Sequence, residues 1–75
     1  MSDQEVRGID KAVAVAGSQK ALGLLIGSSQ QLVASWQKQG YVPLERVVEI
    51  ETATGVPRVE LVKPVIVELL TQASF

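Results

Sequence analysis

The side chains with the most specific binding chemistry are two adjacent glutamines, Gln30 and Gln31, which follow a pair of serines. A glutamine amide can form two hydrogen bonds at once with N6 and N7 of adenine in the major groove of DNA. Ala34 and Ser35 follow one helical turn later, and an alanine methyl can contact the methyl group of thymine. If residues 30–39 form a helix, these four side chains share one face. We therefore predict that they contact bases; the alternative for each is an ordinary solvated position on a helix.

Composition excludes several kinds of catalytic and metal-binding chemistry. The 75 residues contain no histidine and no cysteine. A disulfide scaffold, a thiolate or imidazole zinc site and a Ser-His-Asp triad are therefore not available. The glycines at positions 17, 23 and 27 are spaced as helix punctuation and not as a phosphate-binding loop. We expect a protein that is not an enzyme and that needs no metal ion, no cofactor and no small-molecule substrate.

The glutamines lie in a stretch with the layout of a helix-turn-helix, residues 19–38. The spacing of apolar residues predicts helices over 19–26 and 30–39. Two helices that cross steeply through a short turn need a residue that tolerates a positive φ, and Gly27 supplies it. Gly23 provides a small residue where the first helix approaches the second. The second helix of such a motif enters the major groove, so residues 30–39 are the expected recognition helix.

Two serines mark where these helices begin. Ser18 and Ser29 are expected N-caps, whose side chains accept a hydrogen bond from a backbone N–H of the first turn. Helix N-termini of this kind can also bind phosphate groups. The expected contacts to the DNA backbone are therefore Ser18, Gln19, Lys20, Ser29 and, near the end of the second helix, Lys38. The alternatives are a capping role alone for Ser18 and a solvated charge for Lys38.

The distribution of charge favours DNA binding more than the total charge does. The formal net charge is −1, but no aspartate or glutamate occurs between Lys11 and Leu44. This segment has three lysines, at positions 11, 20 and 38, so the helix-turn-helix is locally cationic. Because the acidic flanks offset this charge, we expect weak affinity for non-specific DNA.

Helical signals continue on both sides of the motif. Apolar residues at helical spacing predict a helix over residues 9–16, preceded by a mobile arm at residues 1–8. Pro43 and Gly55 are start and stop signals that bracket a further helix over residues 44–54.

The second half also permits strands. It is rich in β-branched residues between Val47 and Val59, and these favour β-structure. Two strands paired across residues 53–57 would give an α+β fold with a C-terminal β-hairpin. The start and stop signals favour the helix instead. We therefore predict an all-α fold, a compact helix-turn-helix head of about five short helices.

Three prominent side chains are expected to have structural roles. Trp36 falls on the side of its helix opposite the glutamines, which favours a place in the core; the alternative is that its ring stacks on a base. Arg46 and Arg58 have glutamate neighbours and are expected to form surface ion pairs.

The C-terminal tail, residues 65–75, is more apolar than one small domain can bury. We treat residues 1–75 as a single DNA-binding domain and expect part of the tail to contact a second subunit. A two-fold homodimer would place two recognition helices about 34 Å apart, one turn of DNA. The expected dimer contacts are Leu69, Leu70 and Phe75.

A longer pattern surrounds the glutamines, and its elements occur in this order: Ser29-Gln30-Gln31, Val33, Trp36, Gly40, Val42-Pro43, Glu45-Arg46, Ile50-Glu51, Thr54-Gly55, Arg58, Leu61 and Pro64. In these elements, over roughly residues 9–64, the chain resembles the Cro-like, YdaS-type family of phage and prophage repressors. The resemblance implies a five-helix repressor head that binds operator DNA, often as a dimer.

Several positions depart from the family pattern, among them the end of the expected recognition helix, where Gln37, Lys38 and Gln39 stand in place of arginines, and Val62-Lys63 before the late proline. Leu24 and Leu25 stand where polar or basic residues are usual, and Ser28 stands where an aliphatic residue usually enters the core. The leucines predict an additional apolar surface. The competing hypothesis is therefore a protein-interaction module, antitoxin-like or a degenerate repressor, that binds a partner protein through this surface.

The sequence shows no signal for a membrane or for secretion. No apolar run reaches the ~18 residues of a membrane span, and the first ten residues are polar and partly acidic. We expect a protein of the bacterial cytoplasm, associated with the nucleoid, that contacts double-stranded operator DNA and no membrane.

Overall fold

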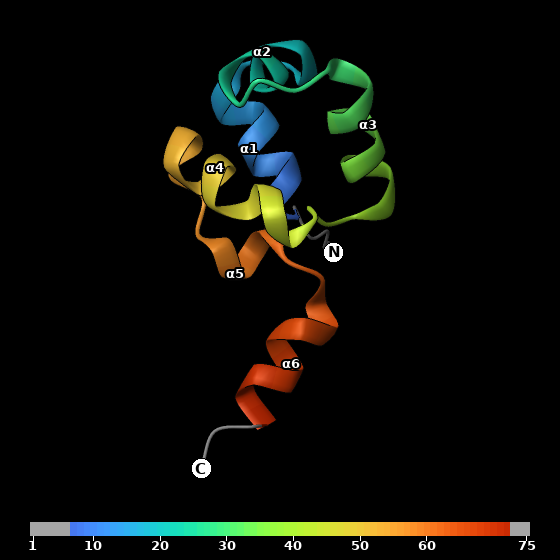
Figure 1. Cartoon of the computed structure of the whole chain (residues 1–75), viewed down its shortest axis with the longest axis vertical. Helices are drawn as coiled ribbons and strands as arrows, with labels where there is room; N and C mark the ends of the chain where they lie inside the picture. Colours follow the sequence, from blue (N-terminus) through green and yellow to red (C-terminus); the bar gives the residue numbers. More distant parts are fainter. Residues whose placement is uncertain (1–6, 73–75) are drawn as a thin grey trace, which may run out of the picture.

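The described part of the chain is built from helices. The computed structural model describes residues 7–72, and this range contains no strand (Figure 1). The helices are α1 Gly8–Ala16, α2 Gln19–Leu25, α3 Gln30–Gln39, α4 Leu44–Thr54, α5 Arg58–Leu61 and α6 Pro64–Gln72. The all-α prediction is confirmed, and the alternative with a C-terminal β-hairpin is wrong.

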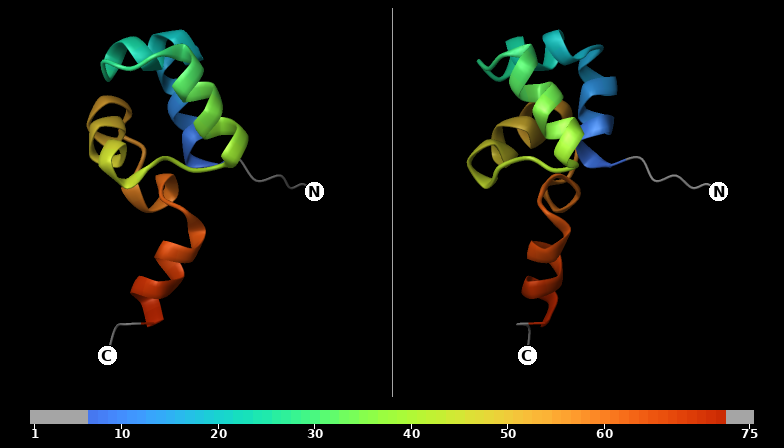
Figure 2. Two further views of the ribbon diagram at one scale, coloured as in Figure 1. Left: turned by 45° about the vertical axis from the view of Figure 1, so that its right-hand side comes forward. Right: turned by 90° about the vertical axis from the view of Figure 1, so that its right-hand side faces the viewer.

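Helices α1 to α5 surround a small aliphatic core, while α6 extends away from them (Figures 1 and 2). Trp36 is only 4% exposed, so its predicted place in the core is confirmed. None of the described residues of α6 belongs to the core. The buried side chains are Ile9, Ala12, Leu22, Ile26, Val33, Trp36, Val42, Val47, Ile50, Val56 and Leu61.

Burial along α4 explains why its β-branched residues do not form a strand. Val47 and Ile50, three positions apart, are buried, whereas Val48 is 53% exposed. This is the spacing of a helix face and not the alternation of a strand. Burial against the core outweighs the weak intrinsic preference of valine and isoleucine for β-structure. Pro43 precedes the helix, and Gly55 ends it with a φ of 80°.

Two glycines shape the turn between α2 and α3, as predicted. Gly27 has a φ of 67°, in the left-handed region. Gly23 is buried, and a Cβ added there would lie 3.1 Å from the carbonyl oxygen of Ser28. The close approach of the two helices therefore depends on the absence of a side chain at this position. Helix α2 ends at Leu25, one residue earlier than expected.

The beginning of α1 belongs to the folded body. Gly8 is buried, and an added Cβ would collide with the backbone carbonyl of Glu60 in α5. Lys11 joins the same two helices, because its Nζ lies 2.7 Å from Oε1 of Glu60. The prediction of an arm over residues 1–8 is therefore wrong at Gly8, where this helix contact orders the backbone. Residues 1–6 lie outside the described part of the chain.

Helix α6 is apolar yet stands apart from the core (Figure 2). Val65 is 45% exposed and Leu69 is 58% exposed. A helix this short is marginal in water unless one face packs against something. Of the three predicted dimer contacts, Leu69 has an exposed side chain on α6 and is available to a partner. Leu70 lies in α6, but its side chain is outside the described part, as is the whole of Phe75.

Candidate nucleic-acid interface

The exposed side of α3 carries all four predicted base contacts. Gln30, Gln31 and Ser35 are exposed, and Ala34 is half-buried. With the exposed Lys38 they form one continuous surface, called here the α3 strip, because their spacing brings neighbours together on one side of a helix. Helix α3 lies along one edge of the body (Figure 1), and its other side packs into the core. The α3 strip thus has the form of a surface that can enter a groove.

Both serines cap their helices, as predicted. The Oγ of Ser18 accepts a hydrogen bond from the backbone N–H of Ala21 at 3.0 Å, and the Oγ of Ser29 accepts one from Leu32 at 3.2 Å. The N–H groups of the first two residues in each helix have no acceptor within the helix. They are donors available to an approaching anion.

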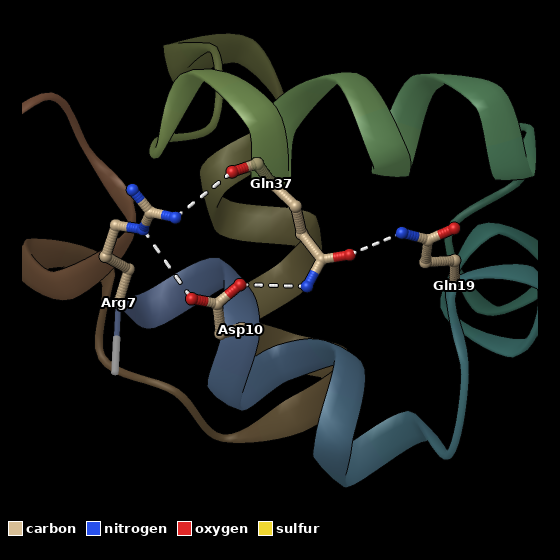
Figure 3. Close-up of polar contacts among 4 residues, drawn as sticks. All are labelled: Arg7, Asp10, Gln19 and Gln37. Carbon is tan, nitrogen blue, oxygen red and sulfur yellow. Dashed lines mark hydrogen bonds and ion pairs between the residues drawn. The ribbon is translucent and has the colours of Figure 1, made fainter. Parts of the chain in front are cut away.

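Gln37 is a polar residue of this region that sequence reasoning missed. It lies on α3, and its half-buried side chain reaches between Asp10 of α1 and Gln19 of α2 (Figure 3). Its Nε2 donates to Oδ1 of Asp10 at 2.8 Å, and its Oε1 accepts from Nε2 of Gln19 at 2.6 Å. The sequence signal for a partly buried Gln37 is its spacing, because it follows the buried Val33 by one helical turn. The side-chain amide of Gln19 therefore donates a hydrogen bond within the protein. The group of Gln19 that remains as a donor for a phosphate is its backbone N–H at the start of α2.

The positive charge beside α3 comes from Lys20 and Lys38. Both are exposed, and neither has an ion-pair partner within residues 7–72. Lys11 contributes less than expected because Glu60 neutralises it. No carboxylate occurs in α2 or α3, so neither helix carries a side chain that repels a phosphate.

The two arginines of the second half form ion pairs, as predicted. Nη1 of Arg46 lies 2.9 Å from Oε1 of Glu49, and Nη2 of Arg58 lies 2.7 Å from Oε1 of Glu51. The hydrogen bond from the Arg58 side chain lowers the pKa of Glu51 below its usual 4.5. The Arg46–Glu49 pair lies within α4, and the Arg58–Glu51 pair joins α4 to α5.

Replacing Arg58 by methionine is expected to change how stability depends on pH. A carboxylate whose pKa is lowered by folding adds stability above its unfolded pKa, 4.5 for Glu51, and this contribution disappears as the pH falls through the lowered pKa. The variant should therefore be less stable than wild type near neutral pH and equal to it in strong acid. Urea unfolding across this range measures the difference. Lys20→Met is the control, and a gap that persists in acid would contradict the assignment.

An apolar groove lies between the end of α2 and α4, away from the α3 strip. It is lined by Leu25, Ile26, Val48, Glu49, Thr52 and Ala53. Leu24 is 74% exposed and Leu25 is 58% exposed, so the additional apolar surface expected from these two leucines is present.

Residues 7–72 lack the features of two other kinds of site. No group of three or more acidic side chains gathers closely enough there to hold a metal ion. No helix in this range combines the length and the apolar character needed to cross a membrane.

Comparison with known proteins identifies one family and one solved structure. The family model described as bacterial toxin YdaS matches residues 9–66. The structure of the Cro protein from the putative prophage element Xfaso 1 in Xylella fastidiosa strain Ann-1 superimposes with a TM-score of 0.70 and 37% sequence identity. The match covers 73% of this chain and 88% of that protein. No curated protein matches the sequence.

Proposed function

Because the chain belongs to the YdaS family and shares its fold with a prophage Cro protein, we propose that it is a transcription repressor of phage or prophage origin that binds operator DNA. The observation that carries the proposal is the α3 strip, which lies on the second helix of a helix-turn-helix. Its side chains are uncharged except for the positive Lys38, and neither helix of the motif has an acidic residue. Such a protein acts in the bacterial cytoplasm, at the nucleoid, by binding alone and without a cofactor.

In this proposal the α3 strip lies in the major groove. Gln30 and Gln31 contact bases near the start of the helix, and Ala34 and Ser35 contact them one turn later. Phosphates on either side of the groove are bound by the helix starts and the two free lysines. The backbone contacts are those at Ser18, Gln19, Lys20, Ser29 and Lys38.

We further propose that the protein binds DNA as a homodimer through α6. A nine-residue apolar helix whose described residues take no part in the core needs a partner to bury its apolar face. A second copy of the chain offers the same helix in a two-fold arrangement. The proposed contacts are Leu69, Leu70 and Phe75, and the expected DNA site is pseudo-palindromic.

Replacing Gln31 by alanine is expected to weaken binding to the preferred sequence by about 1–3 kcal/mol and to relax the preference at one or two base pairs of each half-site. Affinity for random DNA should change little, because phosphate contacts remain. Gln39→Ala is a matched control on the same helix, since the Gln39 amide already donates to the carbonyl of Tyr41 at 3.0 Å. Fluorescence anisotropy on both DNA types measures the effect. Equal losses on preferred and random DNA would reject Gln31 as a base contact.

Selection of bound sequences from a random DNA pool tests the proposed function. A repressor should enrich one pseudo-palindromic sequence. The competing function, a protein-interaction module, is favoured by the apolar groove of α2 and α4 and by the exposed Leu24. A pool that shows no enrichment would favour that alternative.

A further inference from the structure

A chain of hydrogen bonds joins three helices at the last turns of α3. Asp10 in α1, Gln37 in α3 and Gln19 at the start of α2 are linked in series by the two short bonds described above (Figure 3). Arg7 flanks the chain, since its Nε lies 3.6 Å from Oδ2 of Asp10 and its Nη2 donates to the backbone carbonyl of Gln37 at 3.4 Å. We call the series Asp10–Gln37–Gln19 the amide bridge.

The carboxylate at one end determines the orientation of both amides. A carboxylate only accepts hydrogen bonds, so the atom of Gln37 that faces Asp10 must be the donor Nε2. The oxygen of the same amide then faces Gln19, which must present its own nitrogen. Reversing either amide would place two acceptors or two donors together. The amide bridge therefore has one arrangement, unlike two isolated amides on a surface.

The bridge adds a polar attachment near the end of α3, beside the buried Trp36. At the start of α3, the tight approach to Gly23 fixes the helix against α2. Near its end, half-buried Gln37 connects α3 both to α1 and to the first residue of α2. Apolar packing of Val33 and Trp36 holds α3 against the core, and the directed hydrogen bonds of the bridge then fix its tilt.

We propose that Gln37 is a positioning residue for DNA recognition: the amide bridge sets the tilt of α3, and thereby the alignment of the α3 strip with base edges. The inference rests on the proposed DNA binding and adds a specificity-determining role for Asp10 and Gln37, which are not among the proposed DNA contacts. Base contacts demand close alignment, whereas phosphate contacts tolerate small displacements. Loss of the bridge should therefore lower specificity more than it lowers affinity for random DNA.

Gln37→Met removes both hydrogen bonds and keeps the length of the side chain. Measured on the full chain, at a temperature where circular dichroism shows it folded, the ratio of affinities for selected and random DNA should fall by at least about fivefold, the cost of one misaligned base contact. Affinity for random DNA should stay within about twofold. The control is Thr54→Val, which also removes a half-buried pair of hydrogen bonds, to Ile50 and Val56 in and after α4. It should leave the ratio unchanged.

An exchange of charge between positions 10 and 37 distinguishes a positioning role of Gln37 from general destabilisation of the fold. Gln37→Glu alone places two carboxylates together and should lower the affinity ratio further. Combined with Asp10→Asn it restores both bonds, because the asparagine donates to the new carboxylate, which also accepts from Gln19. The double variant has the net charge of wild type and should recover the ratio to within about twofold.

Three outcomes are informative. Recovery in the double variant, with loss in both single Gln37 variants, supports the inference. A folded Gln37→Met protein with the wild-type affinity ratio, or a double variant no better than Gln37→Glu, overturns it while leaving DNA binding intact. A wild-type protein that selects no sequence from the pool rejects the proposed function itself, and with it the role of the bridge in recognition.

Discussion

Trp36→Ala is expected to unfold the domain, with DNA binding lost as a consequence. Replacing a buried tryptophan by alanine costs about 3–5 kcal/mol, from lost burial and from the cavity that remains. A domain of this size is stabilised by only about 4–11 kcal/mol in total. At 4% exposure, Trp36 is the only aromatic side chain in the core of the described residues. Thermal unfolding followed by circular dichroism measures the effect.

Trp36→Phe is the matched variant, because it keeps an aromatic ring in the same place. It should lose less stability than the alanine variant and retain sequence-specific binding wherever it is folded. A Trp36→Ala protein that melts near wild type but no longer binds DNA would show that the ring acts at the DNA surface.

Removal of α6 is expected to abolish dimers and weaken binding to a two-half-site operator by about 10²–10⁴-fold, because the second half-site is no longer bound within one assembly. A chain that ends at Lys63 should still fold, since the core contains no described residue of α6. Leu69→Glu tests the same contact without truncation, because Leu69 is 58% exposed. Sedimentation with and without operator measures the assembly.

Val15→Glu is the control for that experiment. Val15 is as exposed as Leu69, at 61%, but lies on α1. It should leave dimers and cooperative binding unchanged. If the full chain remains monomeric on an operator with two half-sites, or if the chain ending at Lys63 still binds cooperatively, α6 is not the dimer interface.

Features that depend on local interactions could be predicted from the sequence. Ser18 and Ser29 act as caps within their own first turns, and Gly27 is required by the local backbone conformation. The core position of Trp36 followed from helical periodicity. The limits of α3 and α4 were predicted because serine, proline and glycine mark them directly in the chain.

Features that depend on contacts between distant residues could not be predicted. The ion pair between Lys11 and Glu60 joins residues 49 positions apart, so the sequence overstated the cationic charge near the helix-turn-helix. The role of Gln37 depends on how α1 and α2 pack against α3. The position of α5 involves a hydrogen bond from the Val42 N–H to the Leu61 carbonyl at 2.8 Å, between residues 19 positions apart, for which the sequence has no local signal.

The most direct test of the central claim is a salt titration of DNA binding by the full chain, on the selected sequence and on random DNA. For a repressor that binds phosphates, the logarithm of affinity should fall linearly with the logarithm of salt concentration, with a slope of about −0.9 per phosphate contact. Lys20→Met and Lys38→Met should each reduce that slope by about one, while the preference for the selected sequence persists. Absence of DNA binding, or an affinity that depends neither on salt concentration nor on Lys20 and Lys38, would contradict the proposed binding of operator DNA.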